Sequence, residues 1–211
     1  PAHTPAMRTG PWTFAWLATF WGVLAWPAIG PKDYATWGLE VAPALAGFAV
    51  LATTHRRFPL TPLAYGLVLA HCVILMVGGH YTYAEVPLGD WVRDALGGTR
   101  NDYDKLGHFA QGFVPAIVAR ELLVRLAVVN GARWRAFLVV CTCLAISAAY
   151  ELVEWGVALL SEEAAAAFLG TQGYVWDTQS DMGWALTGAV LALLLLGRLH
   201  DRQLARLPRA G

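Results

Sequence analysis

The chain has 211 residues, of which 57% are hydrophobic and 14% are charged, and its formal net charge is zero. Soluble domains usually carry about 25% charged residues, and the mean hydropathy here is +0.47. This composition excludes an ordinary soluble domain and predicts an integral membrane protein with one domain over residues 1–211. Because no basic run resembles a nucleic-acid-binding surface, we expect the lipid bilayer, and no nucleic acid, as a partner.

Six apolar runs predict transmembrane helices, so the expected fold class is all-α, a polytopic membrane helix bundle. The first run is too long and too aromatic for the core of a signal peptide, and we expect it to be retained. Asp90 is expected to cap a short interfacial helix over residues 91–96, and a second short helix is expected within 161–177. The six transmembrane helices are expected at residues 12–29, 38–54, 61–79, 105–129, 134–160 and 180–197.

Polar residues interrupt three of these helices at helical spacings. Charged side chains inside a membrane are costly, so they usually face a protein interior or a water-filled cavity and mark a function. The pairs on the three helices fall at one depth of the bundle, and each pair shares one helix face. We therefore expect them to converge on one polar site, made of Asp104, His108, Gln111, Glu151, Glu154, Asp177 and Asp181.

The chemistry of this set favours a divalent metal. Two carboxylates one turn apart in an apolar stretch need a proton, a cation or a partner. Carboxylates with imidazole suit Zn, Mn or Fe, and carboxylates with water suit Mg. The expected ligands are His108, Glu151, Glu154, Asp177 and Asp181. Taken singly, Asp104 and Asp177 also suit helix caps, and His108 suits a hydrogen bond across the bundle.

Two features lie deeper in the fourth helix. Pro115 cannot donate a hydrogen bond to the carbonyl of Gln111, so we expect it to bend the helix. Arg120 and Glu121 lie near its cytoplasmic end. Arg120 with Arg125 is interpreted as a pair of anchors there, with a buried ion pair to another helix as the alternative.

The blocks that carry these residues resemble the YjdF-type family of bacterial inner-membrane proteins, which has no assigned activity. They read HYTYAEVPLGDW at residues 80–91, RNDYDKLGHFAQGFVPAIVAREL at 100–122, AAYELVEW at 148–155 and FLGTQGYVWDTQSDM at 168–182. The chain departs from the expected pattern after TQG, where Tyr174 stands in place of an acidic residue. The resemblance implies a multi-pass protein of the bacterial inner membrane.

A more distant similarity connects the chain to VanZ-like membrane proteins. It rests on the D-K-x-x-H-F start at residues 104–109, on the helix-borne Glu151 and on the region 177–181. That family is linked to glycopeptide-antibiotic tolerance at the cell envelope, so the similarity implies an envelope function.

Three functions remain open on this basis. The polar site is expected to bind or act on an envelope lipid or small molecule, with or without a metal. Alternatively, the protein is a small proton- or ion-coupled transporter, or an accessory subunit that contacts other membrane subunits. The lack of an inverted repeat argues against transport, and the number of carboxylates at one depth argues against a purely structural role.

The positive charges predict the topology. Arginines concentrate on one side of the six-helix arrangement, and the positive-inside rule puts that side, with both termini, in the cytoplasm. Reporter fusions should therefore report Arg56, Arg133 and Arg202 as cytoplasmic, and Asp94 and Glu163 as periplasmic. A result with Arg133 and Asp94 on the same side contradicts the arrangement.

Overall fold

The computed structural model describes residues 10–160 and 171–207, and this part of the chain is helical without strands. The helices in chain order are α1 Pro11–Ala25, α2 Tyr34–Thr54, α3 Pro62–Tyr81, the 3₁₀ turn η1 Tyr83–Glu85, α4 Pro87–Leu96, α5 Tyr103–Arg125, α6 Ala132–Ala158 and α8 Asp177–Leu204. The part of the second expected short helix within residues 161–170 lies outside the described residues.

Each of the six long ranges expected from the sequence coincides with a helix, although the ends differ. α8 begins at Asp177, not at residue 180, and it continues past Gly197 to Leu204 because the polar residues there are good helix formers. The cap position of α8 is Trp176 and that of α5 is Asp102. Asp177 and Asp104 are therefore residues of the first helical turn, and the capping interpretation of both is wrong.

Four helices, α2, α3, α6 and α8, are long and apolar enough to cross a membrane by length and composition. The helix α1 has 15 residues, which rise about 22 Å and fall short of a hydrocarbon core about 30 Å thick. The helix α5 has 23 residues and carries charges at both ends. The fold is thus an all-helical membrane bundle.

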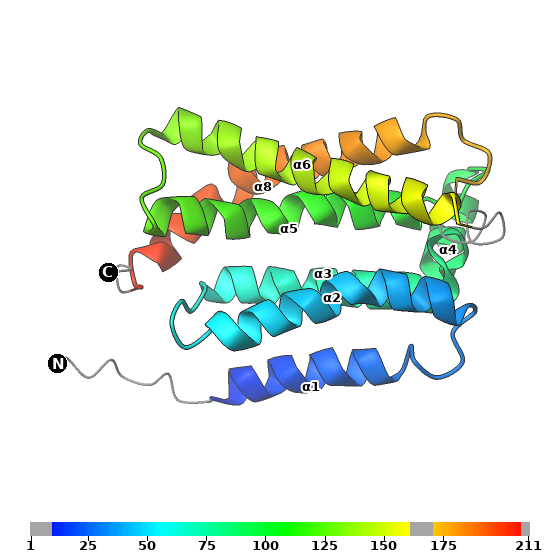
Figure 1. Cartoon of the computed structure of the whole chain (residues 1–211), viewed down its shortest axis with the longest axis horizontal. Coiled ribbons are helices and arrows are strands. Elements are labelled where there is room, and N and C mark those ends of the chain that lie inside the picture. Colours follow the sequence, from blue (N-terminus) through cyan, green and yellow to red (C-terminus); the bar gives the residue numbers. More distant parts are fainter. Residues whose placement is uncertain (1–9, 161–170, 208–211) are drawn as a thin grey trace.

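The helices run lengthwise in two groups, with α1, α2 and α3 in one and α5, α6 and α8 in the other (Figure 1). Packing of α3 on α5 joins the groups. The α2–α3 turn, the α5–α6 turn and the start of α1 lie at one end of the bundle, and α4 lies at the other end. The polar residues at the start of α5 and of α8 lie at the α4 end.

The short helix α4 differs from the expectation at its start and agrees at its end. It begins at Pro87, because proline fits the first helical position, where its missing N–H costs no hydrogen bond. Asp90 is therefore not the cap, and its carboxylate instead accepts hydrogen bonds from Arg93 (2.7 Å) and Asn101 (3.0 Å). Gly97 ends the helix in the left-handed region, at φ 66°. Trp91 and Leu96 stay exposed, as an interfacial helix requires.

A buried hydrogen-bond network fills the end of the bundle opposite α4. Glu121 is fully buried, and its carboxylate accepts hydrogen bonds from the backbone N–H of Thr61 (3.0 Å), its hydroxyl (2.8 Å) and Arg125 (2.9 Å). The ring of His200 lies 3.1 Å from the same carboxylate. Glu121 therefore ties α5 to the start of α3 and to α8. The anchor interpretation of Arg120 and Arg125 stays a prediction.

The backbones of α5 and α8 meet at two glycines. A side chain at Gly112 would clash with the carbonyl oxygen of Ala185, and one at Gly188 would clash with the carbonyl oxygen of Phe109. Small side chains continue the contact along α8 at Ala189, which is fully buried. Such close approach is typical of helix pairs in membranes, where small residues replace the hydrophobic effect as the source of packing.

Alanine at Gly112 or Gly188 should therefore force the two helices apart. We expect a loss of about 1–3 kcal/mol in the free energy of unfolding for each variant, the usual cost of overpacking. Thermal unfolding in detergent, followed by circular dichroism, measures it. The matched control is Gly22→Ala in α1, where no atom lies within 4 Å of the added carbon. Unchanged unfolding of both variants would contradict the close contact.

Candidate functional site

His108 stands at the centre of the polar residues that the sequence grouped together. Its Nε2 lies 3.3 Å from an oxygen of Asp104 and 3.9 Å from an oxygen of Asp181. Its Nδ1 lies 3.2 Å from the amide oxygen of Gln111 and 3.9 Å from a carboxylate oxygen of Glu151. Side chains from α5, α6 and α8 therefore meet around one buried imidazole, as expected from their spacing.

Three of these residues are arranged as metal ligands. One atom each from Asp104, His108 and Asp181 lies within 4.8 Å of the other two. One oxygen of Asp181 and one of Glu151 are buried and accept no hydrogen bond in the described part of the chain. Buried polar atoms without a partner are rare in proteins, so these oxygens suit contact with water, a proton or a bound cation. Two carboxylates and an imidazole suit Zn, Mn or Fe.

The structure brings together only some of the metal ligands that were predicted from the sequence. His108 and Asp181 belong to the group of three, and Asp104, which the sequence assigned to the site but not to the metal, joins them. Glu151 borders the group, at 3.9 Å from His108. Asp177 turns instead toward Arg100. Glu154 lies on the wall of a cavity beside the group.

Arg100 supplies a positive charge that the sequence analysis did not assign to the site. It precedes α5, pairs with Asp177, lies 3.3 Å from Asp104 and donates to the carbonyl of Thr171 (3.1 Å). Burial disfavours the charged guanidinium, but the hydrogen bond and charge of Asp177, followed by the charges of Asp104 and Asp181, raise the pKa of Arg100. The side chain is thus a permanent cation beside the acids.

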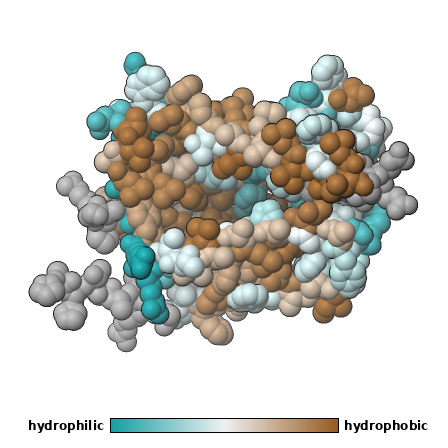
Figure 2. All heavy atoms as spheres, viewed as in Figure 1, coloured by the Kyte–Doolittle hydropathy of each residue, from teal (hydrophilic) through white to brown (hydrophobic). Residues whose placement is uncertain are grey.

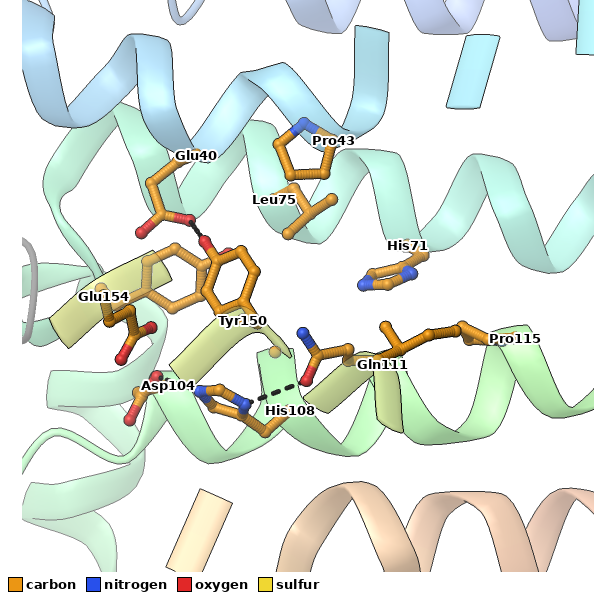
Figure 3. Close-up of a pocket in the computed structure, with 13 residues that line it drawn as sticks. Glu40, Pro43, His71, Leu75, Asp104, His108, Gln111, Pro115, Tyr150 and Glu154 are labelled. Atoms are coloured by element: carbon orange, nitrogen blue, oxygen red, sulfur yellow. Dashed lines mark hydrogen bonds and ion pairs between the residues drawn. The ribbon is translucent and has the colours of Figure 1, made fainter. Parts of the chain in front are cut away.

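A cavity of about 140 Å³ opens beside His108, between α2 and α3 on one side and α5 and α6 on the other. We call it the α2–α6 hollow. Figure 3 shows Glu40, His71, Tyr150 and Glu154 around it, and Tyr150 donates a hydrogen bond to Glu40 (3.0 Å). The Nε2 atom of His71 is buried without a hydrogen-bond partner.

Of these wall residues, the sequence predicted Glu154 and missed Glu40 and His71. Neither of the two has a second acidic, basic or imidazole side chain one helical turn away in its own helix, so no pattern pointed to them. Tyr83 lies in η1, and burial, followed by the charge of Glu40, raises the pKa of its hydroxyl, so this hydroxyl stays a hydrogen-bond donor. Pro115 also lines the hollow, within the continuous helix α5. The bend expected at Pro115 stays a prediction.

The charges of the site do not balance by themselves. Its acids are Glu40, Asp104, Glu151, Glu154, Asp177 and Asp181, and the cations among them are Arg100 and, when protonated, His108. Buried carboxylates in excess of cations either bind protons or attract a cation. The arrangement therefore suits binding of a cation, proton exchange, or both.

The helix bundle and the buried acidic residues inside it place the chain in the class of polytopic membrane proteins with an internal polar site. The chain belongs to the family described as predicted membrane protein (DUF2238), which matches residues 12–202. It is 55% identical over 184 residues to Inner membrane protein YjdF of Escherichia coli (strain K12), covering 87% of this chain and 88% of that relative. The resemblance seen in the sequence is confirmed, and the protein is a multi-pass protein of the inner membrane. No solved structure matches the chain.

Removal of the positive charge of Arg100 should destabilise the protein. The Arg100→Gln variant leaves Asp177 and Asp104 without their charged partner, and hydrogen bonds to charged groups contribute about 1.5–3 kcal/mol each. We expect a loss of that size in the free energy of unfolding, measured by thermal denaturation in detergent. The control is Arg93→Gln, whose pairs with Asp90 and Asp94 lie at the surface, where solvent screens them, so this variant should lose clearly less stability. Equal losses in both variants would contradict a special role of Arg100.

Proposed function

We propose that this protein binds a divalent metal at Asp104, His108 and Asp181 and uses the site to bind or act on an envelope lipid or small molecule. The observation that carries the proposal is the group of three ligand atoms within 4.8 Å of one another. The buried, unpartnered oxygens of Asp181 and Glu151 support it, because a metal would satisfy them.

We further propose six membrane spans, α1, α2, α3, α5, α6 and α8, with both termini in the cytoplasm and the site near the periplasmic face. The α2–α3 and α5–α6 turns and the start of α1 share one end of the bundle (Figure 1). The arginines of those turns, Arg56, Arg57, Arg133 and Arg135, support a cytoplasmic position of that end. In a membrane, α1 would span with the help of the turn that follows it.

The residues around the proposed metal have separate tasks. When bound, a divalent metal supplies Lewis acidity to an oxygen of the substrate or to a water molecule. Gln111 fixes the ring of His108 through the contact to Nδ1, so that Nε2 faces Asp104 and Asp181. Arg100 pairs with Asp177, which keeps this carboxylate away from the three proposed ligands and offsets its negative charge.

Elemental analysis of purified protein tests the site. We expect about one Zn, Mn, Fe or Mg ion per chain, and none after Asp181→Asn or His108→Ala. Because the ligands act as a unit, the double variant should lose no more metal than either single variant. The matched control is Asp201→Asn in the same helix, where the carboxylate is 61% exposed.

A second measurement does not depend on the variants. Chelated wild-type protein, titrated with each metal, should gain about 2.7 kcal/mol of stability at a metal concentration 100-fold above the dissociation constant. Absence of metal from the purified protein, together with no stabilisation by any of the four metals, would overturn the proposed metal site.

A further inference from the structure

The α2–α6 hollow opens on the side of the bundle. Figure 2 shows it near the middle of one face, with hydrophobic residues around it and hydrophilic residues at its base. The helix α2 packs on α3, and α6 packs on α5 and α8, so α2 and α6 form the two edges of the opening. The hydrogen bond from Tyr150 to Glu40 connects these edges.

The two helices that border the opening, α2 and α6, expose apolar side chains on their surfaces. Leu39 and Leu45 on α2 are 36% and 41% exposed, and Val153 on α6 is 51% exposed. Ile146 lines the hollow and is also 40% exposed. Both α2 and α6 are long and apolar enough to span a membrane. An opening with such edges meets acyl chains, so a ligand reaches it from the bilayer.

The base of the hollow is rich in hydrogen-bond acceptors and has an acidic character. Carboxylates of Glu40, Asp104 and Glu154 contribute to its wall, and no lysine or arginine of the described residues lines it. An anionic head, such as a phosphate, would meet the carboxylates of Glu40 and Glu154 at short range, and these two lie outside the group of proposed metal ligands. An ammonium group, with three donors and a positive charge, matches carboxylate acceptors.

The size of the hollow and one ring nitrogen without a hydrogen-bond partner limit the kind of ligand further. The hollow's volume of about 140 Å³ is close to that of an engineered cavity of about 150 Å³ that binds benzene, so it suits a small head group. The ring of His71 points into the hollow, toward Gln111 (Figure 3), and its buried Nε2 has no hydrogen-bond partner in the described chain. A ligand in the hollow would give that nitrogen a partner.

We propose that the α2–α6 hollow binds the primary-amine head of a membrane amphiphile that enters from the bilayer between α2 and α6. The ammonium group lies against Glu154 and Glu40, and the chain leaves past Ile146 and Pro43. The inference rests on the proposed function in treating this region as a binding site for an envelope amphiphile. It does not require the metal, because Glu154 and Glu40 are outside the group of three ligands.

Binding of matched amphiphiles to the purified wild-type protein tests the chemistry of the head. Dodecylamine, dodecanol and dodecyl phosphate share one chain and differ in the head alone. Native mass spectrometry in a neutral detergent should show one dodecylamine per protein, with dodecanol and dodecyl phosphate bound at least about tenfold more weakly. Equal or tighter binding of dodecyl phosphate would overturn the proposal.

A short amine tests whether the ligand reaches the hollow from the bilayer or from water. Propylamine carries the same head without a chain that partitions into lipid. It should not displace dodecylamine at a hundredfold excess, because its head reaches the hollow without the contacts to the apolar edges. Displacement at equal concentration would show a site for free amines and would overturn entry from the bilayer.

The Glu154→Gln variant locates the binding site. It should weaken dodecylamine about tenfold and leave dodecanol unchanged, because an amide keeps the size and loses the charge. The matched control is Glu85→Gln, whose side chain is 55% exposed and pairs with Lys32 outside the hollow. Unchanged binding in a folded Glu154→Gln protein would overturn the assignment to the hollow, and the wild-type comparison above decides the matter if that variant does not fold.

The same assay with a chelator separates this inference from the metal site. Selective binding of dodecylamine in the presence of chelator, by a protein that never contains metal, would contradict the proposed metal function and support the amine site. Metal at Asp104, His108 and Asp181 with no preference for the amine would contradict the amine site alone.

Discussion

Two glycines, Gly112 on α5 and Gly188 on α8, let the backbones of these helices approach until each meets a carbonyl oxygen of the other. The same helices begin at the α4 end of the bundle, where α5 carries His108 and α8 carries Asp181. Because the helices are rigid and in contact, their approach fixes the 3.9 Å between the imidazole and that carboxylate. A wider separation would admit lipid or other side chains between them. The polar site therefore depends on two positions that have no polar atom in their side chains.

The sequence predicted the parts of the site that repeat along a helix. Apolar length located the membrane helices, and the pair Glu151 and Glu154 was found because two acids in an apolar run share one helix face. His71 has no such repeat, and its place beside the site follows from the packing of α3 on α5, which a one-dimensional pattern does not contain. Helix ends were less predictable, since α8 continues through polar residues to Leu204.

Spacing also could not decide which acid turns toward His108. Two residues one turn apart lie on one face of a helix, but the rotation of that face is set by packing against the neighbouring helices. In the structure, α6 directs Glu154 to the hollow and Glu151 to the edge of the ligand group. The carboxylate that completes the group is Asp104, on the same helix as His108 and one turn before it. It was thus easier to infer from the sequence which residues belong to the polar site than which of them contact His108 and which line the hollow.

The two polar clusters of the bundle differ in how many hydrogen-bond donors surround their buried carboxylates. At the end opposite α4, Glu121 is fully buried, yet Thr61, Arg125 and His200 surround its carboxylate with donors. Donors from α5, α8 and the start of α3 therefore satisfy this carboxylate and stabilise the contacts among the helices. Near the α4 end, buried oxygens of Asp181 and Glu151 lack donors. Buried polar groups without donors are costly in a membrane, and this cost is the reason why the proposed ligand belongs at the α4 end and not at the opposite one.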